Sequence, residues 1–240
     1  MKSKFEFLPT EIFFEIFDYL TTFDIFYGFI HLNQQFDHII HSYPIQLDFQ
    51  DIIRRKFDII CQSIHPKQII SLYLSEELMP DQVQLFHQYF PLFSEQFLSL
   101  KKFKCLNTSF ILPSLPVTLS SVTIKTYRKT SETDQSIVRI LRQQSQHLTY
   151  LAIDGSYAFR SIDVTFPRLT HFILDYCTVS EFHRILTQIQ SPLILLKIYF
   201  DKEDTFTLPN FQQLTNSLQY ISMIFSEGRR NISFFFFLNI

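Results

Sequence analysis

Glycine is scarce in this chain of 240 residues, which contains only Gly28, Gly155 and Gly228, far apart from one another. A loop that cradles phosphate groups needs several glycines close together, because glycine lets successive backbone amides approach an oxyanion. The sequence therefore argues against the phosphate-binding loops of P-loop and Rossmann folds. It also lacks a G-x-S-x-G nucleophile motif, and we expect no enzymatic activity.

Cysteine is also rare, and the chain has no tryptophan. Cys61, Cys105 and Cys177 are odd in number and widely spaced, which fits neither a disulfide framework nor a zinc site. Each lies in or near an apolar run, so we expect buried thiols in a reducing compartment. Among eight histidines, His38 and His41 are three positions apart, but zinc needs three or four converging ligands. We expect no metal and no cofactor.

No apolar run is long enough to cross a bilayer, and Glu11, Glu15 and Asp18 interrupt the first twenty residues. We therefore predict no signal peptide, no membrane association, and a cytoplasmic or nuclear location. The net charge is -2, with acidic and basic residues interspersed, so no nucleic acid is expected as an obligate partner. Apolar residues make up 46% of the chain, enough for a sizeable core in one or two domains.

The first forty residues predict three short helices. The first helix runs from Pro9 to Leu20, and its proline suits the first helical turn, where a backbone N–H would lack a partner. Its apolar residues fall at positions 12, 13, 16, 17 and 20, which is a helical stripe. Thr22 is the candidate cap of the second helix, and Asn33 is the candidate cap of the third. The third helix ends at Ser42-Tyr43-Pro44, because the residue before a proline disfavours the helical conformation.

This segment carries a recognisable pattern over about residues 5–45. Its residues are Leu8-Pro9-x-Glu11-Ile12-x-x-x-Ile16-Phe17-x-Tyr19-Leu20, then Asp24-Ile25, then Leu32-Asn33-x-x-Phe36. The pattern resembles an F-box, although that family often has tryptophan in the third helix, where this chain has Phe36. The resemblance implies a Skp-family adaptor as partner and, through it, cullin and RING subunits.

Carried over position by position, the resemblance implies a set of adaptor-facing residues. These are Leu8, Pro9, Ile12, Ile16, Phe17, Leu20, Ile25 and Phe29. The alternative is that these side chains form only the core of the bundle. Against it, Phe13 and Phe14 extend the apolar surface beyond one stripe, and a bundle of this size cannot bury so many large side chains.

A second pattern, L-x-x-L-x-L with conservative replacements, occurs seven times. It starts at Ile69, Leu100, Leu119, Leu148, Leu169, Leu193 and Leu218. The separations run from 19 to 31 residues, and helical patterns occupy 80–90, 133–146 and 179–189. This resembles the leucine-rich repeat, with a typical period of 20–29 residues. We expect an irregular α/β repeat solenoid with parallel strands on its concave face and helices outside. An ordinary α/β domain is the alternative.

The repeats depart from the family pattern, because the asparagine that usually follows the strand is mostly missing and only Cys177 resembles it. Residues between the motif positions should point to the concave face, since successive side chains of a strand alternate. The predicted target-binding residues are Tyr73, Lys102, Lys104, Lys125, Tyr150, Asp154, Asp175, Lys197 and Tyr199. They form a basic end, an acidic middle and a mixed remainder. The alternative is a solvated face without a ligand.

These observations divide the chain into four parts: an F-box at 3–45, a linker at 46–66, a repeat region at 67–226 and a ragged or truncated tail at 227–240. Together they predict a non-catalytic substrate-recognition subunit of an SCF-type cullin–RING ubiquitin ligase, which binds an adaptor at one end and an unknown protein target at the other. The alternative is a repeat scaffold that acts outside ubiquitin transfer.

Overall fold

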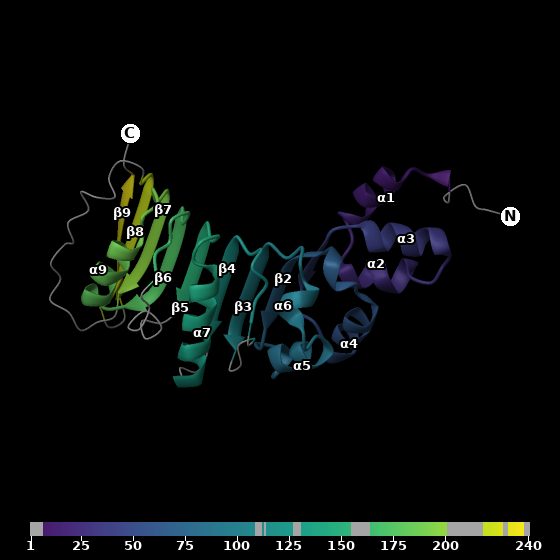
Figure 1. The fold of residues 1–240 in the computed structure, drawn as a ribbon, viewed down its shortest axis with the longest axis horizontal. Coiled ribbons are helices and arrows are strands. Elements are labelled where there is room, and N and C mark those ends of the chain that lie inside the picture. Colours follow the sequence, from purple (N-terminus) through teal and green to yellow (C-terminus); the bar gives the residue numbers. More distant parts are fainter. Residues whose placement is uncertain are drawn as a thin grey trace.

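The computed structural model describes residues 7–108, 112, 114–126, 131–154, 164–200, 218–227 and 230–237. Three helices lie at the N-terminal end of an elongated molecule, and a long sheet with helices along one side makes up the rest (Figure 1). The chain passes through the sheet in order from the helical end to the C-terminus.

The N-terminal helices are α1 (Thr10–Phe17), α2 (Thr22–Phe29) and α3 (Gln34–Ser42). The Asn33 side chain accepts a hydrogen bond from the Phe36 N–H at 3.0 Å, which confirms the predicted cap of α3. The cap of α2 is Thr21 rather than Thr22, because its Oγ1 accepts from the Asp24 N–H. The core of this bundle consists of Phe13, Phe17, Ile25, Phe26, Phe36, Ile39 and Ile40.

Within the described residues, nine strands form one sheet in the order in which they occur in the chain. The first eight are parallel, and the ninth is antiparallel to the eighth. They are β1 (Ile45–Asp48), β2 (Ile69–Ser75), β3 (Lys102–Thr108), β4 (Ser121–Thr126), β5 (Tyr150–Asp154), β6 (His171–Cys177), β7 (Leu195–Phe200), β8 (Tyr220–Glu227) and β9 (Arg230–Phe237). The order never reverses, unlike that of a doubly wound sheet.

Each of the seven sequence motifs leads into one strand, from β2 to β8. The fourth motif residues lie side by side across the sheet, as Leu72, Phe103, Val122, Leu151, Phe172, Leu196 and Ile221. The sixth motif residues form a second row across the sheet, two residues further along each strand. The first motif residues are fully buried in all seven cases. The motif therefore marks one apolar face of a parallel sheet.

The backbone repeats the same hydrogen-bond geometry at the second motif position. In five of the motifs the carbonyl at this position accepts two N–H donors from the start of the next strand, at 2.8–3.1 Å. The accepting residues are Lys101, Ser120, Thr149, Thr170 and Ile194. At three of them a side chain adds to the pattern, because the Ser120, Thr149 and Thr170 hydroxyls each donate to the preceding carbonyl of the series, that of Lys101, Ser120 and Thr149 respectively. Successive strands therefore begin at equivalent positions, although the segments between them differ in length.

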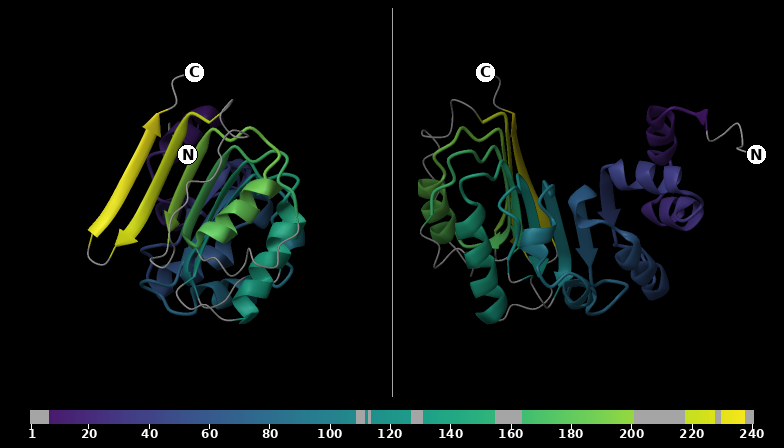
Figure 2. Two further views of the ribbon diagram at one scale, coloured as in Figure 1. Left: turned by 90° about the vertical axis from the view of Figure 1, so that its left-hand side faces the viewer. Right: turned by 45° about the vertical axis from the view of Figure 1, so that its right-hand side comes forward.

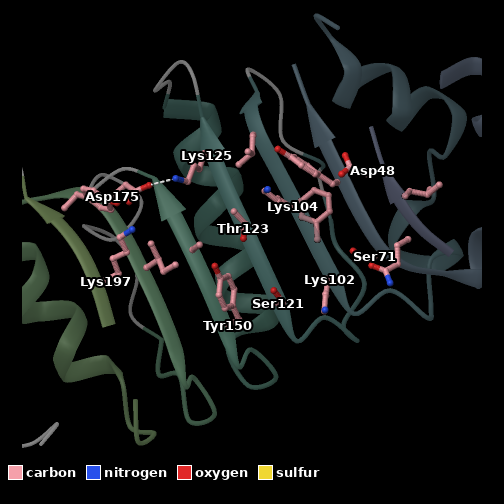
Figure 3. Close-up of a pocket in the computed structure, with 18 residues that line it drawn as sticks. Asp48, Ser71, Lys102, Lys104, Ser121, Thr123, Lys125, Tyr150, Asp175 and Lys197 are labelled. Atoms are coloured by element: carbon pink, nitrogen blue, oxygen red, sulfur yellow. Dashed lines mark ion pairs between the residues drawn. The ribbon is translucent and has the colours of Figure 1, made fainter. Parts of the chain in front are cut away.

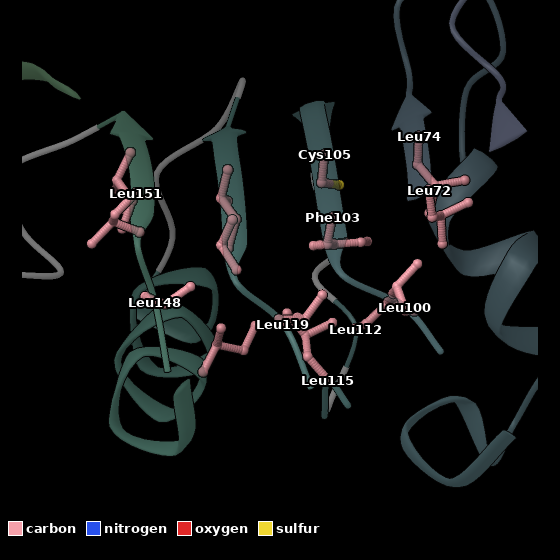
Figure 4. Close-up of a cluster of buried hydrophobic side chains, with 14 of the residues drawn as sticks. Leu72, Leu74, Leu100, Phe103, Cys105, Leu112, Leu115, Leu119, Leu148 and Leu151 are labelled. Carbon is pink, nitrogen blue, oxygen red and sulfur yellow. The ribbon is translucent and has the colours of Figure 1, made fainter. Parts of the chain in front are cut away.

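The segments between strands contain α4 (Arg54–Ser63), the short helix Pro66–Gln68, α5 (Gln82–Tyr89), α6 (Phe93–Gln96), α7 (Ser131–Gln144) and α9 (Val179–Gln188). The helices lie along one face of the sheet (Figure 2). The polar side chains lie on the other, open face (Figure 3), and the motif leucines pack on the helix side (Figure 4). The predicted helices at 80–90, 133–146 and 179–189 are confirmed as α5, α7 and α9.

Two segments differ from the predicted division of the chain. The predicted linker 46–66 contains α4 and most of β1, where Leu47 pairs in register with Leu72. The segment is therefore part of the sheet, and Pro44 stands where the motif would begin. The predicted tail 227–240 contains β9, whose backbone pairs with β8 along its length and covers the edge that β8 would otherwise expose.

Candidate functional site

The open face of the sheet contains a hollow of about 570 Å³ that extends from β1 to β7 (Figure 3). Eight of the nine predicted target-binding residues line it: Tyr73, Lys102, Lys104, Lys125, Tyr150, Asp175, Lys197 and Tyr199. The ninth, Asp154, is the register partner of Asp175 on the same face, and its side chain lies outside the described part. The alternation rule therefore places these residues on one surface, as predicted.

The middle of the hollow has a floor of small side chains. One row across the sheet runs from Lys104 on β3 through Thr123 and Ala152 to Ile173 and then Lys197 on β7. Because Thr123 and Ala152 are short, the longer side chains on neighbouring strands stand around them. The hollow thus has a lysine on either side of a nearly uncharged floor.

Lys125 and Asp175 form an ion pair above this floor, with Nζ and Oδ2 2.6 Å apart. Asp175 is 6% exposed, whereas the Lys125 side chain is 42% exposed. The other carboxylate oxygen of Asp175, Oδ1, is buried and accepts no hydrogen bond among the described residues. A carboxylate in such a place depends on its counter-charge. The predicted basic end and acidic middle are therefore not separate, because Lys125 belongs to the Asp175 pair.

Two other lysines of the hollow rest on tyrosine rings. Lys104 Nζ lies 3.9 Å from the centre of the Tyr73 ring, and Lys197 Nζ lies 5.0 Å from that of Tyr199. Burial, followed by the nearby Asp48 carboxylate, raises the pKa of Tyr73, so its ring stays neutral beneath the cation. Such contacts hold an ammonium group in place while leaving it able to donate hydrogen bonds.

Sequence reasoning missed Asp48, which also lines the hollow. It pairs in register with Tyr73, but it lies in the predicted linker, where no L-x-x-L-x-L motif marks a strand of the sheet. The signal was present in the alternation of the buried residues Ile45, Leu47 and Phe49 around it.

The N-terminal bundle changes the predicted adaptor-facing set. Phe17 and Ile25 are only 1% and 2% exposed and belong to the core of the bundle, so they offer no surface to a partner. Pro9 is exposed and Ile12 is 37% exposed. Four more are partly buried and pack against the core: Leu8, Ile16, Leu20 and Phe29. The stripe of α1 is thus divided, because Phe13 and Phe17 point inward while the residues just before them lie at its border.

Further exposed apolar side chains surround this end of the molecule. They are Phe7, Tyr19, Tyr27 and Leu32. The bundle is joined to the sheet through β1, because the Thr22 hydroxyl donates to the Gln46 carbonyl at 3.2 Å. A smaller hollow of about 370 Å³ lies at this junction, between the start of α2, β1 and α4. The bundle therefore covers the outer edge of the first strand.

The three cysteines are buried, as expected from their apolar surroundings. Burial raises the pKa of both Cys61 and Cys105, so these thiols stay protonated and poorly nucleophilic. In the described part of the chain, no three histidine, cysteine or acidic side chains come together where they could hold a metal ion. None of the helices described there combines the length and apolar character needed to cross a bilayer.

No protein-family model matches this sequence, and comparison with curated proteins reveals no relative. The resemblance to F-box and leucine-rich-repeat proteins therefore rests on the motif residues themselves.

Proposed function

We propose that this chain is an F-box protein with an irregular leucine-rich-repeat solenoid and acts as a substrate-recognition subunit of an SCF-type ubiquitin ligase. The observation that carries the proposal is the pair of surfaces at separate places on one chain. An apolar helical surface around Pro9 and Ile12 lies at one end, and a polar hollow lies on the open face of a sequentially ordered sheet.

Two observations support the repeat part of the proposal: the strand order, and the hydrogen bonds that recur at the carbonyl of the second motif residue. A solenoid stacks each unit on its sequence neighbours, which produces a sheet whose strand order follows the chain. Repeated carbonyls that accept two N–H donors each show that successive units begin in the same way. A position at the end of the strand also recurs, because Thr108 and Cys177 are buried after residues with positive φ, Asn107 and Tyr176.

The proposed mechanism is geometric. The bundle binds a Skp-family adaptor and, through it, cullin and RING subunits, while the open face binds a protein target. Joining the two raises the effective concentration of target lysines near the charged conjugating enzyme. In this mechanism no residue of the chain takes part in the transfer of ubiquitin.

The adaptor-binding step is tested with one exposed isoleucine and a matched control. Ile12→Glu places a charge in the first turn of α1, where it suits the helix dipole but would be buried by the adaptor. Burying an uncompensated carboxylate costs several kcal/mol, so we expect adaptor binding to weaken at least roughly tenfold. Titration calorimetry with a purified Skp-family adaptor measures this.

Ile53→Glu is the control, because Ile53 is also exposed and precedes a helix, α4, outside the apolar surface of the bundle. It should bind the adaptor as the unaltered chain does. If the unaltered chain shows no affinity for the adaptor, the ligase proposal fails, and a scaffold outside ubiquitin transfer becomes the better interpretation. If both variants weaken binding equally, the adaptor does not use α1.

A further inference from the structure

We infer that the open face binds an extended acidic protein segment, with two acidic side chains about six residues apart that reach Lys104 and Lys197. The inference rests on the proposed target-binding role of this face and specifies the chemistry of the target. The acidic groups are oxyanions, either carboxylates or phosphates.

The charges of the hollow favour an anionic ligand. Its described lining contains four lysines, Lys102, Lys104, Lys125 and Lys197, and two aspartates, Asp48 and Asp175. The ion pair of Lys125 with Asp175 neutralises one of each. No ion pair among the described residues involves Lys102, Lys104 or Lys197. The lysines without such a pair lie on both sides of the Lys125–Asp175 pair, Lys102 and Lys104 on β3 and Lys197 on β7.

The spacing follows from the sheet. Lys104 on β3 and Lys197 on β7 lie in one row, four strands apart. Neighbouring strands are about 4.8 Å apart, so the two positions are separated by about 19 Å. An extended peptide advances about 3.3 Å per residue and covers this distance in about six residues. The low floor at Thr123 and Ala152 lets its backbone lie close to the sheet.

A protein segment suits this face better than a nucleic acid. A nucleic acid carries a phosphate at every step and is bound by many basic contacts along its backbone. Here the row between Lys104 and Lys197 is uncharged, Asp48 lies in the same row two strands beyond Lys104, and Asp175 also lines the hollow. These carboxylates would repel a continuous line of phosphates but tolerate two separate acidic side chains.

Asp175 acts as a positioning residue in this arrangement, since it holds Lys125 and keeps that ammonium group from the ligand. Asp175→Asn keeps the size of the side chain and removes the charge that binds Lys125. The open face then carries one negative charge fewer. We expect this variant to prefer acidic segments more strongly than the unaltered chain, an effect that misfolding would not produce.

The test is selection of a random linear-peptide display library on the immobilised full-length chain, followed by sequencing. The unaltered chain should enrich peptides with two acidic residues about six positions apart, and Asp175→Asn should increase this enrichment. The double variant Lys104→Glu, Lys197→Glu should reverse the charge of the selected peptides from acidic to basic. Lys67→Glu, an exposed lysine outside the hollow, is the matched control and should select as the unaltered chain does.

Enrichment without a charge preference, or acidic enrichment that survives the double reversal, would overturn the inference. So would tight binding of a single-stranded oligonucleotide that the double reversal abolishes, because the face would then bind nucleic acid. Selected peptides resynthesised with phosphoserine in place of glutamate distinguish phosphate from carboxylate, and tighter binding of either supports the inference. Adaptor binding measured on the same variants separates the two proposals, since neither lysine lies on the bundle.

Discussion

At the scale of single residues, two buried glutamine side chains on the helices bind backbone groups near the strands. Gln82 is fully buried on α5, where its Oε1 accepts from the Ser75 N–H at 2.8 Å and its Nε2 donates to the Phe49 carbonyl at 2.9 Å. Gln144 on α7 is also buried and hydrogen-bonded to the backbone, because its Nε2 donates to the Pro116 carbonyl at 2.9 Å. Gln82 thus satisfies backbone groups where β1 and β2 end, and Gln144 satisfies one in the segment before β4.

Gln82→Met should therefore destabilise the protein markedly. The thioether has a similar size but leaves the Ser75 N–H and the Phe49 carbonyl buried without partners, at about 1–3 kcal/mol for each group. We expect a loss of roughly 2–5 kcal/mol in the free energy of unfolding, measured by urea denaturation. Gln84→Met on the exposed side of the same helix should change it by less than about 0.5 kcal/mol. Equal effects from both variants would contradict the bridging role of Gln82.

At the scale of elements, α9 shows how a helix between strands is held at its start. The Thr178 side chain accepts from the Glu181 N–H at 3.2 Å, and the Glu181 carboxylate accepts from the Thr178 N–H at 3.0 Å. This is a complete capping box, and it immediately follows β6. The sequence placed this helix well because its apolar stripe is strong, with Phe182 and Ile185 fully buried.

Thr178→Ala should remove one side of the box and lower stability by about 1 kcal/mol. The circular-dichroism melting temperature is a suitable measurement. Thr187→Ala, near the other end of α9, is the control. The Thr187 hydroxyl is exposed and donates to the Arg184 carbonyl in the C-terminal half of the helix, so it takes no part in the capping box. A larger loss in Thr187→Ala than in Thr178→Ala would show that the capping box contributes little.

At the scale of the whole molecule, β1 connects the bundle to the sheet. Leu47 is buried and pairs with Leu72, and the Phe49 N–H donates to the Tyr73 carbonyl at 3.0 Å. On its other side, β1 receives the hydrogen bond from Thr22 on α2. A linker would let the two ends move independently, whereas this connection couples them. In the proposed ligase subunit, it would fix the distance between adaptor and target.

Leu47→Ala should therefore destabilise both the bundle and the first strands of the sheet. Removing a buried leucine costs about 2–5 kcal/mol, and hydrogen exchange should show reduced protection in α2 and in β2 alike. Leu98→Ala, at an exposed leucine beyond α6, should leave both unchanged. If α2 kept its full protection in Leu47→Ala, the bundle would fold independently of the sheet.

Strands β2 to β8 and the main helices between them follow from local sequence. A period of two marks one apolar face of a strand, and a period near 3.6 marks one side of a helix, whatever lies elsewhere in the chain. The same rule placed Tyr73, Lys104 and Lys197 on the open face, which the structure confirms. The L-x-x-L-x-L motif does not mark β1, because Pro44 replaces its first leucine, or β9, which turns back and runs antiparallel.

Only the tertiary structure decided which side chains meet. Lys125 and Asp175 are fifty residues apart on β4 and β6, and their pairing depends on the register of both strands with β5. It likewise decided that Phe17 and Ile25 turn inward while Ile12 remains exposed, since α1 has apolar residues on two adjoining sides. Sequence periodicity specifies a face, but the orientation of each face toward core or solvent depends on what packs against it.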